Sequence, residues 1–317
     1  MNKILTIKFG AKAALFASAI IWGISFLIVK TSVDVMGPHT LLALRFTIGC
    51  ILLALIFHKR FKNLNKEYLL MGGFLGSCLF FAYSLQTIGI TDTTPGKNAF
   101  LTAIYCVLVP FIYWAVDRKR PDRFHLIAAV ITILGIGLVS LNESLTIGMG
   151  DSLSLISGIF YAVHMVAVAK FSKDKDPILL TILQFAFAAV YSWIVTLLFE
   201  EFPTEWSYQT IAGILYLAVL ATSVALLLQN IGQKYTNPAQ ASIILSLESV
   251  FGVVTSVIFY HEEITVKLFL GFVFIFIAVL TSETKLSFLK KNESKEQVTN
   301  VSNIPQNTFD NTLEQAE

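Results

Sequence analysis

Residues 85–95 read LQTIGITDTTP, and residues 228–238 read LQNIGQKYTNP. The two stretches share six identical residues (Leu, Gln, Ile, Gly, Thr and Pro) at one constant offset of 143 positions. The same offset relates two pairs of small residues, Ala128 with Gly271 and Gly135 with Ala278. The chain is therefore predicted to contain two homologous halves.

The composition is that of a membrane protein. Of the 317 residues, 55% are hydrophobic and 14% are charged, and the mean hydropathy is +0.71. Soluble domains carry about 25% charged residues. Apolar runs close to the length that crosses about 30 Å of hydrocarbon recur along the chain, and their continuous apolarity favours helices over barrel strands. Ten spans are predicted: 13–29, 39–57, 68–90, 97–116, 124–141, 152–169, 177–199, 208–231, 238–260 and 266–282.

Positive charges predict the orientation of these spans, because Lys and Arg are retained on the cytoplasmic side. With the N-terminus inside, 19 of the 23 lysines and arginines fall on the cytoplasmic side. Only Lys30, Lys97 and Lys267 fall on the opposite side, and Arg45 lies inside a span. Both termini are therefore expected in the cytoplasm.

These observations predict an all-α membrane protein of ten transmembrane helices, built as two inverted five-helix repeats. Five helices per half is an odd number, so the second copy must insert upside down. The repeats are predicted at 11–142 and 150–284, and the polar stretch 286–317 is predicted to be a disordered cytoplasmic tail. Inverted repeats are an architecture of secondary transporters.

Several motifs resemble one family. The first span reads Trp22-Gly23-x-Ser25-Phe26-x-x-x-Lys30 and is followed by Pro38 and Arg45. The ninth begins Pro238-Ala239, continues to Leu247-Glu248-Ser249-Val250, and is followed by Glu262. This pattern is similar to that of the EamA family of the drug/metabolite transporter superfamily, although Ser249 replaces a usual proline and Ala128 a common glycine. The resemblance covers residues 11–284 and implies a ten-helix exporter of small molecules, without naming the substrate.

Two charged residues lie well within the predicted spans, Arg45 and Glu248. A charged side chain at the bilayer centre costs about 2.5–3.5 kcal/mol on insertion scales, which makes each a candidate functional group. Glu248 is a candidate protonation site or partner of a substrate cation, or alternatively a tie between two helices. Arg45 is a candidate partner of an anionic substrate group, or alternatively a snorkelling or helix-tying residue.

Other polar side chains recur at helical spacing and predict a substrate cavity between the halves, near the middle of the membrane. The candidates are Trp22 and Ser25 in the first span, Gln86 in the third, Asn98, Thr102 and Tyr105 in the fourth, Tyr161 and His164 in the sixth, Gln229 in the eighth, and Gln240, expected to share a face with Glu248, in the ninth. Each has a structural alternative, such as core packing for Trp22, a simple hydrogen bond for His164 and helix-end capping for the glutamines.

Several functions are excluded or disfavoured by missing motifs. His261-Glu262-Glu263 lacks the second histidine of a zinc-protease helix, because position 265 is Thr. No nucleotide-binding loop is present, so the chain contains no ATPase of its own, and no metal site, cofactor or nucleic-acid partner is expected. Glu200, Glu201 and Glu205 cluster without histidines, which disfavours an intramembrane lipid-modifying enzyme.

The predicted function is therefore secondary transport of a metabolite, an amino acid or a drug. It is expected to operate in a bacterial inner membrane, with the protein acting as a monomer whose partners are the lipid bilayer and a small-molecule substrate. Export is the first expectation, and import or uncoupled facilitation by the same fold is the alternative.

Overall fold

The computed structural model describes residues 2–118, 120–121, 123–140, 147–204, 206–236 and 238–284, so the predicted tail lies outside the described residues. The described elements are all helical. They are α1 (Asn2–Val33), α2 (Pro38–Ile56), η1 (His58–Asn63), α3 (Lys66–Thr91), α4 (Pro95–Thr102), α5 (Tyr105–Asp117), α6 (Arg123–Ser140), α7 (Met149–Phe171), α8 (Pro177–Phe199), α9 (Tyr208–Leu215), η2 (Tyr216–Val224), α10 (Ala225–Tyr235), α11 (Pro238–Thr255), η3 (Ser256–Tyr260) and α12 (Val266–Thr284).

Eight segments are long and apolar enough to cross a membrane, rather than the ten that the sequence predicts. Each of the eight segments, found within the described residues, overlaps one predicted span. Three of them join consecutive helices: Pro95–Asp117, Tyr208–Tyr235 and Pro238–Tyr260. The fifth and tenth predicted spans form α6 and α12, whose apolar stretches, Arg123–Val139 and Val266–Ala278, are shorter. The outward faces of the bundle are apolar, as Leu197, Leu198 and Phe199 illustrate, which suits contact with lipid.

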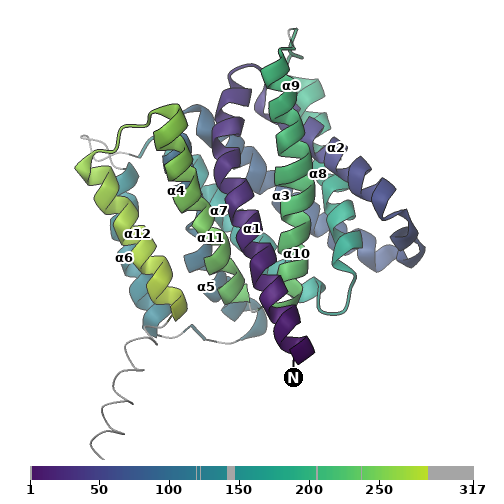
Figure 1. Ribbon diagram of the computed structural model, residues 1–317, viewed down its shortest axis with the longest axis horizontal. Coiled ribbons are helices and arrows are strands. Elements are labelled where there is room, and N and C mark those ends of the chain that lie inside the picture. Colours follow the sequence, from purple (N-terminus) through teal and green to yellow (C-terminus); the bar gives the residue numbers. More distant parts are fainter. Residues whose placement is uncertain are drawn as a thin grey trace, which may run out of the picture.

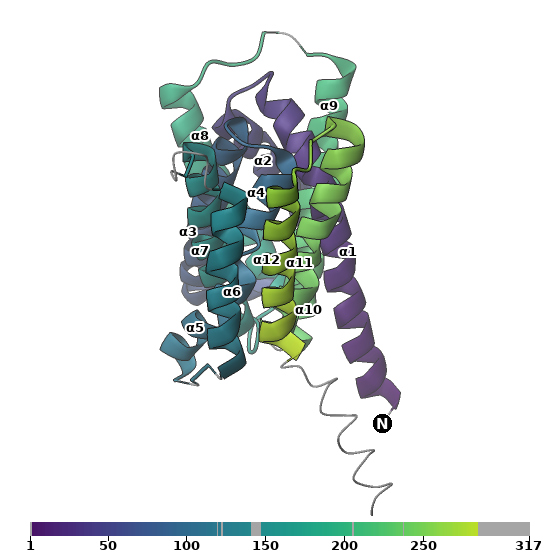
Figure 2. The ribbon, with the colours of Figure 1, turned by 90° about the vertical axis from the view of Figure 1, so that its left-hand side faces the viewer.

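The helices pack in pairs that repeat across the bundle (Figures 1 and 2). α6 and α12 pack against each other at one side of the molecule. Helix α3 packs on α7 and α8, while α10 packs on α1, and α2 packs on both α8 and η2. The N-terminal half of the chain is thus interleaved with the C-terminal half.

Proline marks the starts of four helices, at Pro38, Pro95, Pro177 and Pro238. Proline suits this position because its missing N–H would have no partner in the first turn. At α4, the Thr94 hydroxyl accepts a hydrogen bond from the Lys97 amide. At α2, the cap comes from another helix, since the Glu200 carboxylate accepts from the amides of His39 and Thr40 at 2.8 and 2.7 Å.

The fourth and eighth spans depart from regular α geometry next to the interior of the bundle, and η3 at the end of the ninth span is also π-helical. The fourth span is interrupted at Ala103 and Ile104, between α4 and α5, whereas Pro110 lies inside α5 without ending it. The main irregularity of this span is therefore the interruption at Ala103 and Ile104. The eighth span contains a π-helical stretch, η2, and such wide turns often occur at functional sites.

Candidate functional site

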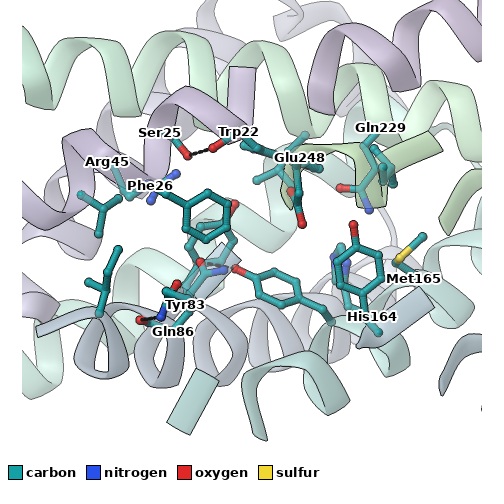
Figure 3. A pocket seen from close by; sticks show the side chains of 17 residues that line it. Trp22, Ser25, Phe26, Arg45, Tyr83, Gln86, His164, Met165, Gln229 and Glu248 are labelled. Atoms are coloured by element: carbon teal, nitrogen blue, oxygen red, sulfur yellow. Dashed lines mark hydrogen bonds between the residues drawn. The ribbon is translucent and has the colours of Figure 1, made fainter. Parts of the chain in front are cut away.

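A cavity lies between α1, α2, α3, α4, α5, α7, α10 and α11 (Figure 3). Ten of the twelve predicted cavity residues line it: Trp22, Ser25, Arg45, Gln86, Asn98, Tyr105, Tyr161, His164, Gln229 and Glu248. The sequence did not single out the remaining lining residues, which are Phe26, Val29, Tyr83, Ile90, Met165, Leu226 and Leu245.

The other two candidates lie elsewhere. Thr102 is buried behind the cavity wall, where its hydroxyl accepts a hydrogen bond from the Gln86 amide nitrogen at 3.3 Å. Gln240 is exposed and does not line the cavity, so its predicted shared face with Glu248 is wrong. Their separation of eight positions rotates the helix by about 80° beyond two full turns, because each residue advances about 100°.

Arg45 is buried within α2, with 1% of its surface exposed. Its Nε donates a 2.8 Å hydrogen bond to the Thr222 hydroxyl in η2. The guanidinium carbon lies 4.6 Å from the centre of the Tyr83 ring, within range of a cation–π interaction. The Nη2 atom has no hydrogen-bond partner. Arg45 thus ties α2 to η2 and still offers an unused donor.

Trp22 forms one aromatic wall of the cavity. Its indole N–H donates a 2.7 Å hydrogen bond to the carbonyl of Ala221, in the π-helical stretch η2. The adjacent Ser25 hydroxyl donates to the Trp22 carbonyl at 2.7 Å, so it is held against its own helix (Figure 3). The wide turn and the tryptophan together fix α1 against the eighth span.

A polar network lines the opposite wall. The Tyr161 hydroxyl donates to the Gln86 Oε1 atom at 3.0 Å, and the Asn98 amide donates to the Ser154 hydroxyl at 2.7 Å. The Asn98 amide also donates to the Gln86 carbonyl at 3.2 Å. Gln86 therefore joins α3 to both α4 and α7, instead of only capping its own helix.

His164 and Gln229 lie together toward one end of the cavity, while Arg45 and Gln86 lie toward the other (Figure 3). The His164 Nε2 atom is 2.8 Å from Gln184 Oε1 in α8, which is the structural pairing expected of a membrane histidine. The Gln229 amide donates to Gln233 Oε1 at 3.4 Å. His164 contacts the cavity with a ring that is already hydrogen-bonded.

The Glu248 carboxyl faces the cavity from α11 and interacts with the hydroxyl of Tyr105, at the start of α5. Arg45 forms no ion pair with it among the described residues. The acid and the guanidinium are separated in Figure 3. The cavity therefore contains two unlike charged side chains that do not neutralise each other directly.

Lining residues come in pairs with constant sequence offsets. Gln86 and Gln229 are 143 positions apart, as are Tyr105 and Glu248, and all four line the cavity. Trp22 and Tyr161 are 139 positions apart and supply the facing aromatic walls. The cavity is thus assembled from corresponding positions of the two halves.

Two helix crossings repeat with the same offsets. A Cβ atom on Gly89 would lie 2.8 Å from the Gly150 carbonyl oxygen, and one on Gly232 would lie 2.9 Å from the Ala11 carbonyl oxygen. The glycines are 143 positions apart and their carbonyl partners 139. Glycine at these crossings lets the helices approach closely, as small residues do in membrane helix packing.

Within the described residues, no group of three or more His, Cys, Asp or Glu side chains is arranged to hold a metal ion. The three cysteines, Cys50, Cys78 and Cys106, are not joined by disulfides. The lining offers hydrogen bonds, aromatic faces and two separated charges, which are suited to binding an organic molecule.

The chain resembles several known proteins. It is 31% identical over 267 residues to an uncharacterized transporter of Archaeoglobus fulgidus, an alignment that covers 83% of this chain and 82% of the relative. It is 24% identical over 281 residues to the uncharacterized transporter YvbV of Bacillus subtilis, covering 84% and 89%. A crystal structure at 16% identity superposes with a TM-score of 0.64, covering 86% of this chain and 96% of the other, which shows a shared fold.

The profile of the EamA-like transporter family matches twice, at residues 10–141 and 148–283. Both matches lie within the helical bundle, and together they cover most of the chain. The relatives from Archaeoglobus fulgidus and Bacillus subtilis are also called transporters. The chain is a multi-pass membrane transporter and belongs to the EamA-like transporter family.

Proposed function

We propose that the protein is a secondary transporter that moves a small organic molecule by alternating access between two inverted five-helix repeats. The proposal counts α6 and α12 as crossings, which makes ten, and it has both termini on the cytoplasmic side of a bacterial inner membrane. An α-helix of 18 residues is about 27 Å long, close to the hydrocarbon thickness. The asymmetric distribution of lysine and arginine supports this orientation.

The observation that carries the proposal is the construction of the cavity from corresponding positions. Trp22 with Tyr161, and Gln86 with Gln229, enclose one space from opposite halves. Two equivalent halves can exchange conformations, which opens a central site first to one side and then to the other. The double match of the family profile supports the same division of the chain.

Contacts at the end of the bundle opposite the N-terminus supply a closed gate. The Lys30 ammonium donates hydrogen bonds to the carbonyls of Ile90 and Thr91, at 2.8 and 3.0 Å, where α3 ends. Lys97 and Asp151 form a 2.8 Å ion pair between α4 and α7. Opening of the cavity toward this side requires these contacts between α1, α3, α4 and α7 to separate.

Glu248 is the candidate coupling group of this cycle. It is the acid that lines the cavity, and its carboxyl contacts a tyrosine hydroxyl rather than a fixed cation. A carboxyl in that setting can bind a proton in one conformation and release it in another. The transported molecule and the proton then compete for, or share, the same cavity.

The test has two stages. A panel of metabolites and drugs is screened for resistance in cells that overexpress the protein, with empty vector as the control. Each compound that gives a difference is then measured in counterflow by the purified protein in liposomes. Counterflow above that of protein-free liposomes is expected. A compound that gives resistance without any counterflow contradicts transport of that compound, and accumulation in place of resistance indicates import.

A further inference from the structure

We propose that Arg45 forms an anion-binding subsite that receives a carboxylate group of the substrate. The inference rests on the proposed transport function, because it specifies the chemistry of the molecule that the same cavity accepts. It assigns the carboxylate to the end of the cavity at which Arg45 and Gln86 lie (Figure 3).

The first argument is the unused hydrogen-bonding capacity of Arg45. A guanidinium has five N–H donors and stays charged in proteins. Nε is used on Thr222 at 2.8 Å, whereas Nη2 is buried and has no partner. Buried donors are rarely left unpaired, and an unpaired one destabilises the structure unless a ligand satisfies it. Arg45 lines the cavity, so a ligand there has access to it.

The second argument is that no protein carboxylate neutralises this cation. Ion pairs are formed by other cations among the described residues, such as Arg60, Lys97 and Lys175, but not by Arg45. Its side chain interacts with the phenol groups of Tyr83, to which it is hydrogen-bonded, and Tyr161, and both are uncharged as phenols. A buried charge without a counter-ion is strongly disfavoured in a low-dielectric interior. A carboxylate matches the planar guanidinium and supplies the missing charge.

Structural explanations account for only part of the geometry. Snorkelling requires the charged head to reach the interface, but Arg45 is 1% exposed. A tie between α2 and η2 requires only the bond from Nε to Thr222. Neither explains why Nη2 of a guanidinium that lines the cavity is buried without a hydrogen-bond partner.

The rest of the lining determines the body of the ligand. Trp22, Phe26, Tyr83, Tyr105 and Tyr161 surround the space with aromatic faces. Pro38 and Pro177 start α2 and α8 at an offset of 139 positions, which makes Gln184 the counterpart of Arg45, so the second half supplies no cation at that position. The cavity therefore accepts a molecule with an apolar or aromatic body and orients its carboxylate toward the Arg45 end.

Binding is measured by intrinsic tryptophan fluorescence of the purified full chain in detergent, because Trp22 lines the cavity. The probes share a phenyl body and differ in their head group: 3-phenylpropionate, its uncharged amide 3-phenylpropionamide, phenethylamine and phenylalanine. The two carboxylate probes are expected to bind about tenfold or more tightly than the amide and the amine, as a charge-assisted pair implies. Equal binding of the amide and the carboxylate, or no binding of either carboxylate probe, overturns the proposal.

Variants locate the effect at Arg45. Arg45→Gln is expected to remove the preference for carboxylate, and Arg45→Lys to retain part of it, because lysine keeps the charge but not the planar fork. Thr222→Val removes the tie to Nε and keeps the guanidinium, so it should keep the preference even where it lowers stability. Lys173→Gln, which removes an exposed charge, is the matched control. A preference that survives in Arg45→Gln, or that Thr222→Val removes, overturns the proposal.

The assay separates this inference from the transport proposal, because it measures binding without flux. Carboxylate binding by a protein that shows no counterflow of any bound probe would contradict transport of these molecules and leave the subsite intact. Counterflow of a substrate that lacks any carboxylate, unaffected by Arg45→Gln, would support transport and overturn the subsite.

Discussion

Tyr105 and Glu248 interact at the cavity and are separated by 143 residues. The same offset relates the LQxIG repeat, which is LQTIG at residues 85–89 and LQNIG at residues 228–232. Corresponding positions of the two halves therefore face each other, one as a phenol and the other as a carboxyl. The same contact has become chemically asymmetric, so one half carries the acid and the other the hydroxyl that contacts it.

Close approach of α1 and α11 beside this contact gives a prediction about stability. A Cβ atom on Gly23 would lie 2.2 Å from the Phe251 Cβ and 3.0 Å from the Glu248 carbonyl oxygen. Gly23→Ala is expected to lower stability by about 1–3 kcal/mol, because neither atom belongs to a flexible side-chain end. Thermal unfolding of the purified protein in detergent measures the change.

Gly10 supplies the matched control on the same helix. A Cβ atom there would meet nothing within 4 Å. Gly10→Ala is expected to leave stability unchanged or raise it by up to about 1 kcal/mol, since alanine favours the helix. Equal unfolding temperatures for Gly23→Ala and Gly10→Ala would contradict the close packing of α1 on α11.

The Glu200 cap of α2 gives a prediction about pH. Partial burial opposes ionisation of Glu200, but hydrogen bonds from the amides and side chains of His39 and Thr40 outweigh it, and the pKa of this carboxyl is lowered. A group with a lowered folded-state pKa stabilises the fold above its unfolded pKa, about 4.3, and loses that contribution as the pH falls through the folded value. Glu200→Gln is expected to destabilise by about 1–3 kcal/mol at neutral pH.

Unfolding measured from neutral pH down to about pH 3 tests this sign. The difference between the wild type and Glu200→Gln should be constant at neutral pH and shrink in acid. Glu201→Gln, which changes the exposed neighbouring acid, is the control and should show no such difference. A stability difference between the wild type and Glu200→Gln that increases in acid would refute the role of the ionised cap.

The orientation of the chain is tested by labelling with a membrane-impermeant thiol reagent. In a cysteine-free background, a cysteine at Glu201 should react in intact cells, and one at Lys173 should react only after permeabilisation, because the two lie at opposite ends of α8. A permeant reagent should label both, which confirms that each site is accessible. Labelling of position 173 in intact cells would contradict the cytoplasmic assignment and, with it, the inverted arrangement.

The sequence predicts those parts of the fold and site that depend on composition and local pattern. The LQxIG repeat identifies Gln86 and Gln229 as corresponding residues, and both line the cavity. The hydropathy profile locates the helices, because burial in lipid requires continuous apolar runs. The hydropathy profile also identifies Arg45 and Glu248 as candidates, because an ionisable side chain within an apolar span is energetically costly and usually has a function.

The remaining features depend on contacts between distant segments. Glu200 caps α2 across 161 and 160 residues, to His39 and Thr40, and no local pattern indicates it. Tyr83 was missed because a tyrosine in an apolar helix is not distinctive until Arg45 is placed over its ring. The break at Ala103 and Ile104 has no proline or glycine to mark it, although a Cβ on Gly158 of α7 would lie 2.9 Å from the Thr102 carbonyl beside it.

The last prediction concerns proton coupling through Glu248. Glu248→Gln keeps the size of the side chain and a hydrogen bond with Tyr105, but it removes the group that binds and releases a proton. In liposomes that contain a transported substrate, flux driven by a pH gradient is expected to vanish in this variant. Exchange of substrate between compartments at equal pH is expected to survive, because that half of the cycle needs no net proton movement.

Tyr105→Phe separates coupling from a structural tie, because it removes the hydroxyl that contacts the acid and leaves the carboxyl in place. Under coupling, gradient-driven flux persists in Tyr105→Phe and is lost in Glu248→Gln, although Tyr105→Phe alters the pH at which flux is half-maximal. Under a purely structural role, gradient-driven flux persists in Glu248→Gln and is lost in Tyr105→Phe. Glutamine can still form a hydrogen bond with Tyr105, whereas phenylalanine cannot bond to Glu248, so Tyr105→Phe is then the less stable of the two variants. Gradient-driven flux that continues undiminished in Glu248→Gln excludes Glu248 as the coupling group and leaves it as the link between α5 and α11.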